Sequence, residues 1–182
     1  PDYSSAASDV YKRQEGNPIE KFVKMVTEIK PTQVTLVPDD INALTSNAGW
    51  DTKKNEAYLK EIVDEFKSNK IRTSIFLDPK IELLESVINI NPDRVELFTE
   101  EYAKGFAKKK YEVINKYMLC ANEISKHGIG INAGHDLSLS NIKFFKNRIE
   151  NLIEVSIGHA LIGESLYFGL EETIKKYLYH LS

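Results

Sequence analysis

The sequence lacks several features that would each point to a particular class of protein. Its single cysteine, Cys120, excludes an internal disulfide and fits a protein of the reducing cytosol. No apolar run approaches the length that crosses a bilayer, so we predict no membrane partner. The formal net charge is only −3 and there is no long basic block, which argues against binding to nucleic acid. We therefore expect a soluble cytoplasmic protein.

Short motifs of cofactor and nucleophile chemistry are also missing. No Gly-rich dinucleotide fingerprint follows an apolar run, and no group of His, Cys or Asp residues has metal-ligand spacing within one segment. The G-x-S-x-G elbow of serine hydrolases does not occur. These absences argue against a dinucleotide, a metal ion and a serine nucleophile.

The composition is that of one globular domain. Of the 182 residues, 42% are hydrophobic and 28% are charged, which suits a folded chain with a proper core. The Ser/Ala-rich segment Pro1–Gln14 has neither a helical nor a strand pattern, and we interpret it as a fusion or assembly remnant. We leave it out of the fold prediction and assign Glu15–Ser182 to one domain.

From Glu15 onward, short apolar runs alternate with segments of helical spacing. We predict five strands, at Gln33–Val37, Ile71–Leu77, Arg94–Thr99, Gly128–Asn132 and Glu154–Ile157. We predict helices at Pro18–Ile29, Asn55–Ser68, Lys80–Ile88, Lys108–Lys126, Leu139–Arg148 and Ala160–Tyr179. This α/β alternation predicts a parallel sheet with helices outside. It fits an open doubly wound sheet or a (β/α)8 barrel, and five strands are too few to close the barrel.

Polar residues at the strand ends mark a candidate site, because ligands of such folds bind at the carboxyl ends of the strands. Glu96 lies inside an apolar strand, where a charge must be paired, so a structural ion pair is the alternative to a functional role. His135 follows Asn-Ala-Gly at a strand end and could transfer protons, or could be structural. Gly158 and His159 open the last helix, which suits an anion site or an ordinary tight turn. Together they suit condensation or proton transfer on a small phosphorylated carbonyl compound.

The same strings, in the same order, resemble the pyridoxine 5′-phosphate synthase family. KPTQVTLVPDD…LTSNAGWD is similar to that family's fourth strand and the loop after it, IRTSIFLDP to its fifth strand and DRVELFTEEYA to its sixth. GIGINAGHDLSLSNI resembles the segment around the family's catalytic histidine, and IEVSIGHALIGESLYFGLEETI resembles its last strand and helix. The resemblance extends from about Glu15 to the C-terminus and favours the barrel over the open sheet.

The resemblance implies a (β/α)8 TIM-type barrel, of which this chain carries about the last five βα units. It implies a homo-oligomer, an octamer, that works without a metal or organic cofactor. The implied reaction condenses 1-deoxy-D-xylulose 5-phosphate with 3-amino-2-oxopropyl phosphate and gives pyridoxine 5′-phosphate, phosphate and water.

The family's functional residues transfer to individual positions here. The catalytic histidine, a proton donor, corresponds to His135, and the family's glutamate base falls on Glu15. Phe98 stands where many members have His, so any role of that side chain is lost here. The expected substrate contacts are Thr45, Asp136, which replaces a glycine of many members, Gly158, His159 and Glu96.

The first three strands of the family, with its phosphate-binding arginines, have no counterpart in the pattern. A barrel without them exposes two sheet edges, so we expect the chain to be poorly soluble or inactive by itself. A non-catalytic phosphate-binding or oligomer-filling subunit is the main alternative. Another barrel enzyme of sugar phosphates, an isomerase or aldolase, ranks last, because none of the five predicted strands carries a Schiff-base lysine.

Overall fold

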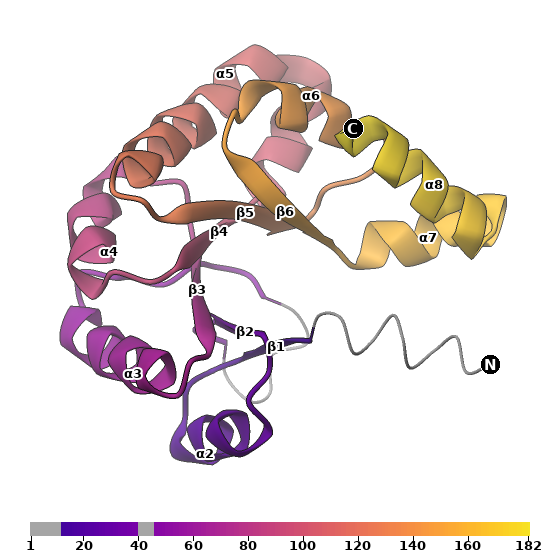
Figure 1. Cartoon of the computed structure of the whole chain (residues 1–182). Coiled ribbons are helices and arrows are strands. Elements are labelled where there is room, and N and C mark those ends of the chain that lie inside the picture. The colour runs from indigo at the N-terminus through magenta and orange to yellow at the C-terminus, as the bar shows by residue number, and fades with distance from the viewer. Residues whose placement is uncertain (1–11, 40–45) are drawn as a thin grey trace, which may run out of the picture.

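The computed structural model describes residues 12–39 and 46–182. In this part of the chain six strands form one parallel sheet, and each strand lies beside its neighbours in sequence. The strands are β1 (Arg13–Gly16), β2 (Gln33–Leu36), β3 (Arg72–Leu77), β4 (Arg94–Phe98), β5 (Gly130–His135) and β6 (Leu152–Ile157). The sheet curls into a half-barrel (Figure 1), which is the shape that sequential parallel strands take in a partial (β/α)8 barrel.

Helices follow the strands and cover the outer side of the sheet. They are α2 (Glu20–Ile29), α3 (Glu56–Ser68), the short η1 (Ile81–Leu83) with α4 (Leu84–Ile90), α5 (Glu100–Lys126), α6 (Ile142–Arg148), α7 (His159–Phe168) and α8 (Leu170–Leu181). In Figure 1, α2 to α6 lie along the convex side, whereas α7 and α8 continue beyond β6. Among the described helices none is both long and apolar enough to cross a membrane.

The core lies between the sheet and the outer helices, as the spacing of apolar residues predicts. In α3 the residues Leu59, Ile62, Val63 and Phe66 recur at helical spacing, and all four are buried against β2 and β3. Each such side chain stabilises the fold by about 1.5–3 kcal/mol when it is fully buried. The outward residues of β4 and β5, such as Val95 and Ile131, pack in a second cluster under α4, α5 and α6.

The inner side of the sheet is polar, because successive side chains of a strand alternate between its two faces. Inside the curve, contacts join Arg13 to Glu96, Arg94 to Asn132, and Asn132 to Glu154. Buried charges require such partners. Ion pairs and hydrogen bonds therefore hold the inner face, together with a small apolar cluster of Val37, Phe76 and Phe98, and the two large apolar clusters lie on the other side of the sheet.

The structure corrects several predicted boundaries. There are six strands in the described residues instead of five, and β1 includes Arg13 and Gln14 from the segment predicted to have no strand. The helix predicted to start at Lys108 starts at Glu100 and bends at Lys109, where φ and ψ leave the helical region. The last predicted helix is two helices, because Gly169 adopts a φ of 79° between them.

Candidate active site

The carboxyl ends of the strands bring several predicted residues to one rim of the half-barrel. Glu15 is the third residue of β1, and His135 is the last residue of β5. The strand predicted to end at Asn132 therefore continues through Ala-Gly-His. Gly158 follows β6, and His159 is the first residue of α7. The predicted contact at Thr45 lies outside the described residues.

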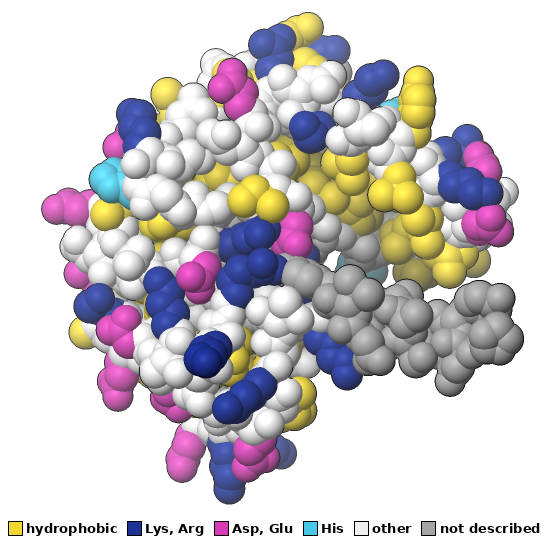
Figure 2. All heavy atoms as spheres, in the orientation of Figure 1, with side chains coloured by type: hydrophobic (Ala, Val, Ile, Leu, Met, Phe, Trp, Pro, Cys, Tyr) yellow, Lys and Arg dark blue, Asp and Glu magenta, His cyan; other side chains and the backbone are white. Residues whose placement is uncertain are grey.

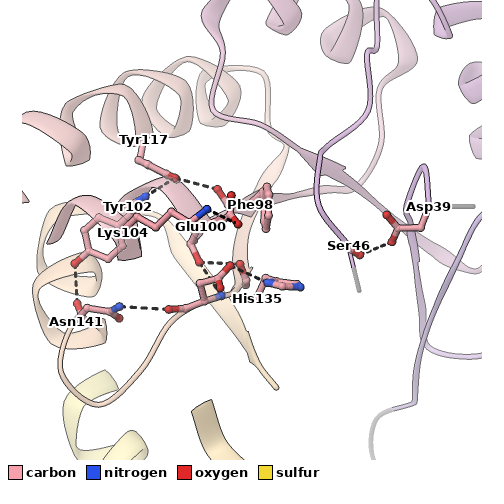
Figure 3. Close-up of polar contacts among 12 residues, drawn as sticks. Asp39, Ser46, Phe98, Glu100, Tyr102, Lys104, Tyr117, His135 and Asn141 are labelled. Carbon is pink, nitrogen blue, oxygen red and sulfur yellow. Dashed lines mark hydrogen bonds and ion pairs between the residues drawn. The ribbon is translucent and has the colours of Figure 1, made fainter. Parts of the chain in front are cut away.

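His135 has an unusual backbone and a well-defined setting. Its φ is 90°, in the region that residues with a Cβ rarely adopt. Its Nδ1 lies 2.7 Å from Oδ2 of Asp136, so the carboxylate fixes the ring's orientation. The ring meets Phe98 edge-on at a centroid distance of 5.3 Å, and the ring of His159 lies 6.3 Å away. Figure 3 shows the imidazole pointing away from α5, toward the side on which Asp39 and Ser46 lie.

Glu15 lies within electrostatic reach of several groups at this rim. Partial loss of solvent raises the pKa of its carboxyl, and the Glu96 carboxylate raises that pKa further. Arg13 and His135 act in the opposite direction. A carboxylate whose pKa lies above its ordinary value is a stronger base than an ordinary carboxylate. The two residues predicted to move protons, Glu15 and His135, therefore influence each other electrostatically.

Glu96 is buried, with 2% of its surface exposed, and it is paired. Its Oε2 accepts a hydrogen bond from Nη2 of Arg13 at 2.8 Å, and Oγ1 of Thr35 lies 3.5 Å away. Burial raises the pKa of Glu96, while Arg13 opposes that shift. Glu96 therefore has the ion-pair partner that the structural alternative requires. A further role for Glu96 in binding substrate remains a prediction. Arg13 was missed because it lies in the segment left out of the fold prediction.

Gly134 is required at its position by the close approach of Glu96. A Cβ on Gly134 would lie 2.4 Å from Oε1 of Glu96 and 2.8 Å from Cβ of Ser156. Real Cβ atoms do not come so close to other heavy atoms. The glycine before His135 therefore provides room for the buried carboxylate, in addition to any freedom it gives the chain.

A second polar group faces the rim from the other side of the half-barrel. The hydroxyl of Ser46 donates a hydrogen bond to the carboxylate of Asp39, and Nδ2 of Asn17 donates to the backbone carbonyl of Asp39 at 3.0 Å. Figure 3 shows Asp39 and Ser46 across from His135. Both lie after β2, and the sequence analysis singled out neither residue.

Gly158 and His159 are both exposed at the start of α7. Gly158 precedes the helix with φ −102° and ψ −97°, and no atom lies within 4 Å of where its Cβ would be. The free N–H groups of a helix start can bind an anion, so the predicted phosphate contact remains a prediction that this geometry permits. Among the residues that the structure describes, no three His, Cys, Asp or Glu side chains form a metal-binding group.

Comparison with known proteins identifies close relatives. The profile of the family described as "Pyridoxal phosphate biosynthesis protein PdxJ" matches residues 6–182. A pyridoxine 5′-phosphate synthase of Christiangramia forsetii is 54% identical over 164 residues, which cover 90% of this chain and 69% of that protein. The synthase of Cytophaga hutchinsonii is 51% identical over 167 residues, which cover 92% of this chain and 70% of that protein. By its sequence and its curled parallel sheet, this chain belongs to the PdxJ family of pyridoxal phosphate biosynthesis proteins.

Proposed function

We propose that this chain supplies the proton-transfer residues of a pyridoxine 5′-phosphate synthase. The reaction is the condensation of 1-deoxy-D-xylulose 5-phosphate with 3-amino-2-oxopropyl phosphate, which gives pyridoxine 5′-phosphate, phosphate and water. Its supporting observation is the placement of Glu15 and His135 on one rim, with the pKa of Glu15 raised. Names of relatives at about half identity support the same reaction class.

In the proposed mechanism, the amine of one substrate attacks the ketone of the other and forms a Schiff base. Phosphate elimination and ring closure follow, and each step moves protons to or from carbon, nitrogen or oxygen. Glu15 accepts protons, because its raised pKa makes it a stronger base than an ordinary carboxylate. His135 donates them, with Asp136 on Nδ1 fixing the orientation of the ring. The proposed substrate contacts are Thr45, Asp136, Gly158, His159 and Glu96.

Two phosphorylated substrates require cationic partners, and the described arginines have other contacts. Arg13 pairs with Glu96, Arg94 contacts Asn132 and Glu154, and Arg148 lies over aromatic rings on α5 and α6. Arginine forks are the usual partners of phosphate groups. We therefore propose that the isolated 182-residue chain does not turn over, and that it works in the cytoplasm within a larger homo-oligomer, an octamer.

A non-catalytic phosphate-binding subunit is the second candidate, and it is favoured by the exposed start of α7 at Gly158 and His159, where backbone N–H groups can bind an anion. The two candidates differ in what His135 does. A binding subunit needs no proton donor, whereas a synthase does. An aldolase with a Schiff-base lysine is disfavoured, because the six strands in the described part of the chain contain no lysine.

The deciding experiment measures pyridoxine 5′-phosphate formation by the chain alone and by the chain co-expressed with the part of the C. forsetii synthase that the match leaves out. We expect no product from the chain alone and product from the co-purified complex. His135→Ala in that complex should lower turnover at least 100-fold, the low end of what a positioned general acid contributes. Product formation that survives His135→Ala would refute the assignment. A complex that binds both substrates without turnover would favour the binding subunit.

A further inference from the structure

The backbone at His135 needs an external support. A φ of 90° is unfavourable for a residue with a Cβ, and such conformations persist only where the surroundings fix them. The two peptide groups that flank His135 are the carbonyl of Gly134 and the N–H of Asp136. Whatever fixes these two groups determines the direction in which the imidazole leaves the chain.

Both peptide groups contact one side chain, the hydroxyl of Thr99. Its Oγ1 donates a hydrogen bond to the Gly134 carbonyl at 2.8 Å and accepts one from the Asp136 N–H at 3.2 Å. The backbone N–H of Thr99 donates to the same carbonyl at 3.2 Å. Thr99 has no exposed surface, so water does not compete for these bonds. A single hydroxyl therefore bridges His135 from the residue before it to the residue after it.

Thr99 is itself held in place by the start of α5. Its carbonyl accepts a hydrogen bond from the N–H of Ala103 at 2.9 Å. The hydroxyl of Tyr117 donates to the carbonyl of Phe98 at 3.0 Å and accepts from the N–H of Tyr102 at 3.2 Å. Figure 3 shows this chain of contacts between α5 and β5. The bridge to His135 thus rests on buried groups that leave it little freedom to move.

We propose that Thr99 is a positioning residue that holds the proton-donating His135 in its left-handed conformation, with its ring against Asp136 and Phe98. The importance of this role rests on the proposed function, in which His135 donates protons. Thr99 acts only through the backbone of His135 and does not touch the substrate. The hydroxyl matters and the methyl group does not, so Ser should replace Thr99 and Val should not.

The test uses the 182-residue chain labelled with ¹⁵N-histidine and ¹³C/¹⁵N, with His135 assigned through His135→Gln. The intraresidue nuclear Overhauser effect between the amide and α protons of residue 135 reports the sign of φ, because these two protons lie closer together at positive φ, and the Nδ1 shift reports the contact with Asp136. We expect the wild-type chain and Thr99→Ser to share both signals. We expect Thr99→Val to lose the strong Overhauser effect of a positive φ and to shift the Nδ1 resonance.

Thr73→Val is the matched control. Thr73 is equally buried, and its hydroxyl likewise donates one hydrogen bond and accepts another, both with Asp93 on the opposite rim. Thr73→Val should leave both His135 signals unchanged. Unchanged signals in Thr99→Val, or the same loss in Thr73→Val, would overturn the proposal. If Thr99→Val fails to fold, a weak Overhauser effect at residue 135 of the wild-type chain, typical of negative φ, overturns the proposal. A strong one, typical of positive φ and kept in Thr99→Ser, supports it. None of these measurements requires turnover, so a failure of this proposal can be distinguished from a failure of the proposed function.

Discussion

The positive φ of His135 leads us to predict that glycine is more stable than alanine at this position, which is opposite to its usual effect in a helix. At a φ of 90° a residue with a Cβ is strained by about 1–2 kcal/mol, and glycine is not. We therefore expect His135→Gly to be more stable than His135→Ala by about 1 kcal/mol. Urea unfolding of the two variants measures this difference directly.

An ordinary helical position supplies the control for this comparison. Lys175 is exposed in α8, where glycine is about 1 kcal/mol less favourable than alanine. Lys175→Gly should therefore be less stable than Lys175→Ala, the opposite order to that at residue 135. If alanine is better than glycine at both positions, the left-handed conformation of His135 is wrong.

The raised pKa of Glu15 in the folded chain predicts that the stability of the fold depends on pH. Partial desolvation and the Glu96 carboxylate raise the pKa of Glu15 in the folded chain above its ordinary value of 4.5. Between these two pKa values the folded state binds more protons than the unfolded state, so the free energy of unfolding falls as pH rises. Glu15→Gln removes this effect. We expect the stability of Glu15→Gln relative to the wild type to increase as the pH rises through 4.5 and to level off above the raised pKa of Glu15.

Urea unfolding at a series of pH values tests this, with Glu28→Gln as the control. Glu28 is an exposed residue of α2, far along the helix from the rim. Its replacement should change stability by a similar amount at every pH. A Glu15→Gln curve parallel to the wild-type curve would show that the carboxyl is not perturbed, and it would weaken its proposed role as a base.

At the scale of the elements, β4, β5 and β6 come together so closely at Gly134 that no side chain fits. A methyl group there would lie 2.4 Å from the Glu96 carboxylate, which is buried and fixed by Arg13. Gly134→Ala should therefore destabilise the fold by about 1–3 kcal/mol, as overpacking does elsewhere. Gly163→Ala is the matched control, because Gly163 lies within α7 with open space around it. There alanine should stabilise the helix by about 1 kcal/mol, and equal effects of the two substitutions in thermal unfolding would contradict this account.

The elements that were predictable from sequence are those whose burial follows a local period. Helix α3 was predicted to within one residue, because its four apolar residues repeat on one face and all of them reach the core. Strand β1 was missed, because its Arg and Glu residues look unsuited to a strand. Arg13 is held there by a partner 83 positions away, Glu96. Local patterns contain no information about that pairing.

The residues of the candidate site also differ in how far the sequence alone pointed to them. His135 and Glu96 stood out by their context, a histidine at a strand end and a charge inside an apolar strand. Thr99 and Asp39 did not, because a threonine or an aspartate near a strand end is common. Their significance arises only when Thr99 reaches both neighbours of His135 and Ser46 reaches Asp39. The sequence therefore pointed to the groups that we propose to do the chemistry more clearly than to those that orient them.

At the scale of the whole molecule, the end of the sheet at β6 carries an apolar surface that the described residues leave uncovered. Helix α7 has no buried residue. Figure 2 shows hydrophobic side chains gathered between the sheet and the two last helices. Among the most exposed hydrophobic residues of the two helices are Leu166 at 83% and Tyr167 at 86% on α7, and Tyr179 at 71% and Leu178 at 62% on α8. Exposed apolar surface of this kind promotes association.

We therefore expect the isolated chain to self-associate in the micromolar range, with α7 and α8 in the contact. Replacing Leu166 and Tyr167 together by Glu should shift its sedimentation toward the 20.8 kDa monomer, because buried charges would then oppose the contact. Ile29→Glu on α2 is the control, since Ile29 is 62% exposed but lies at the opposite end of the sheet. If the double replacement leaves the distribution unchanged, the contact lies elsewhere, and the open edge of β6 becomes the next surface to block. If Ile29→Glu is equally effective, association depends on net charge and not on this face.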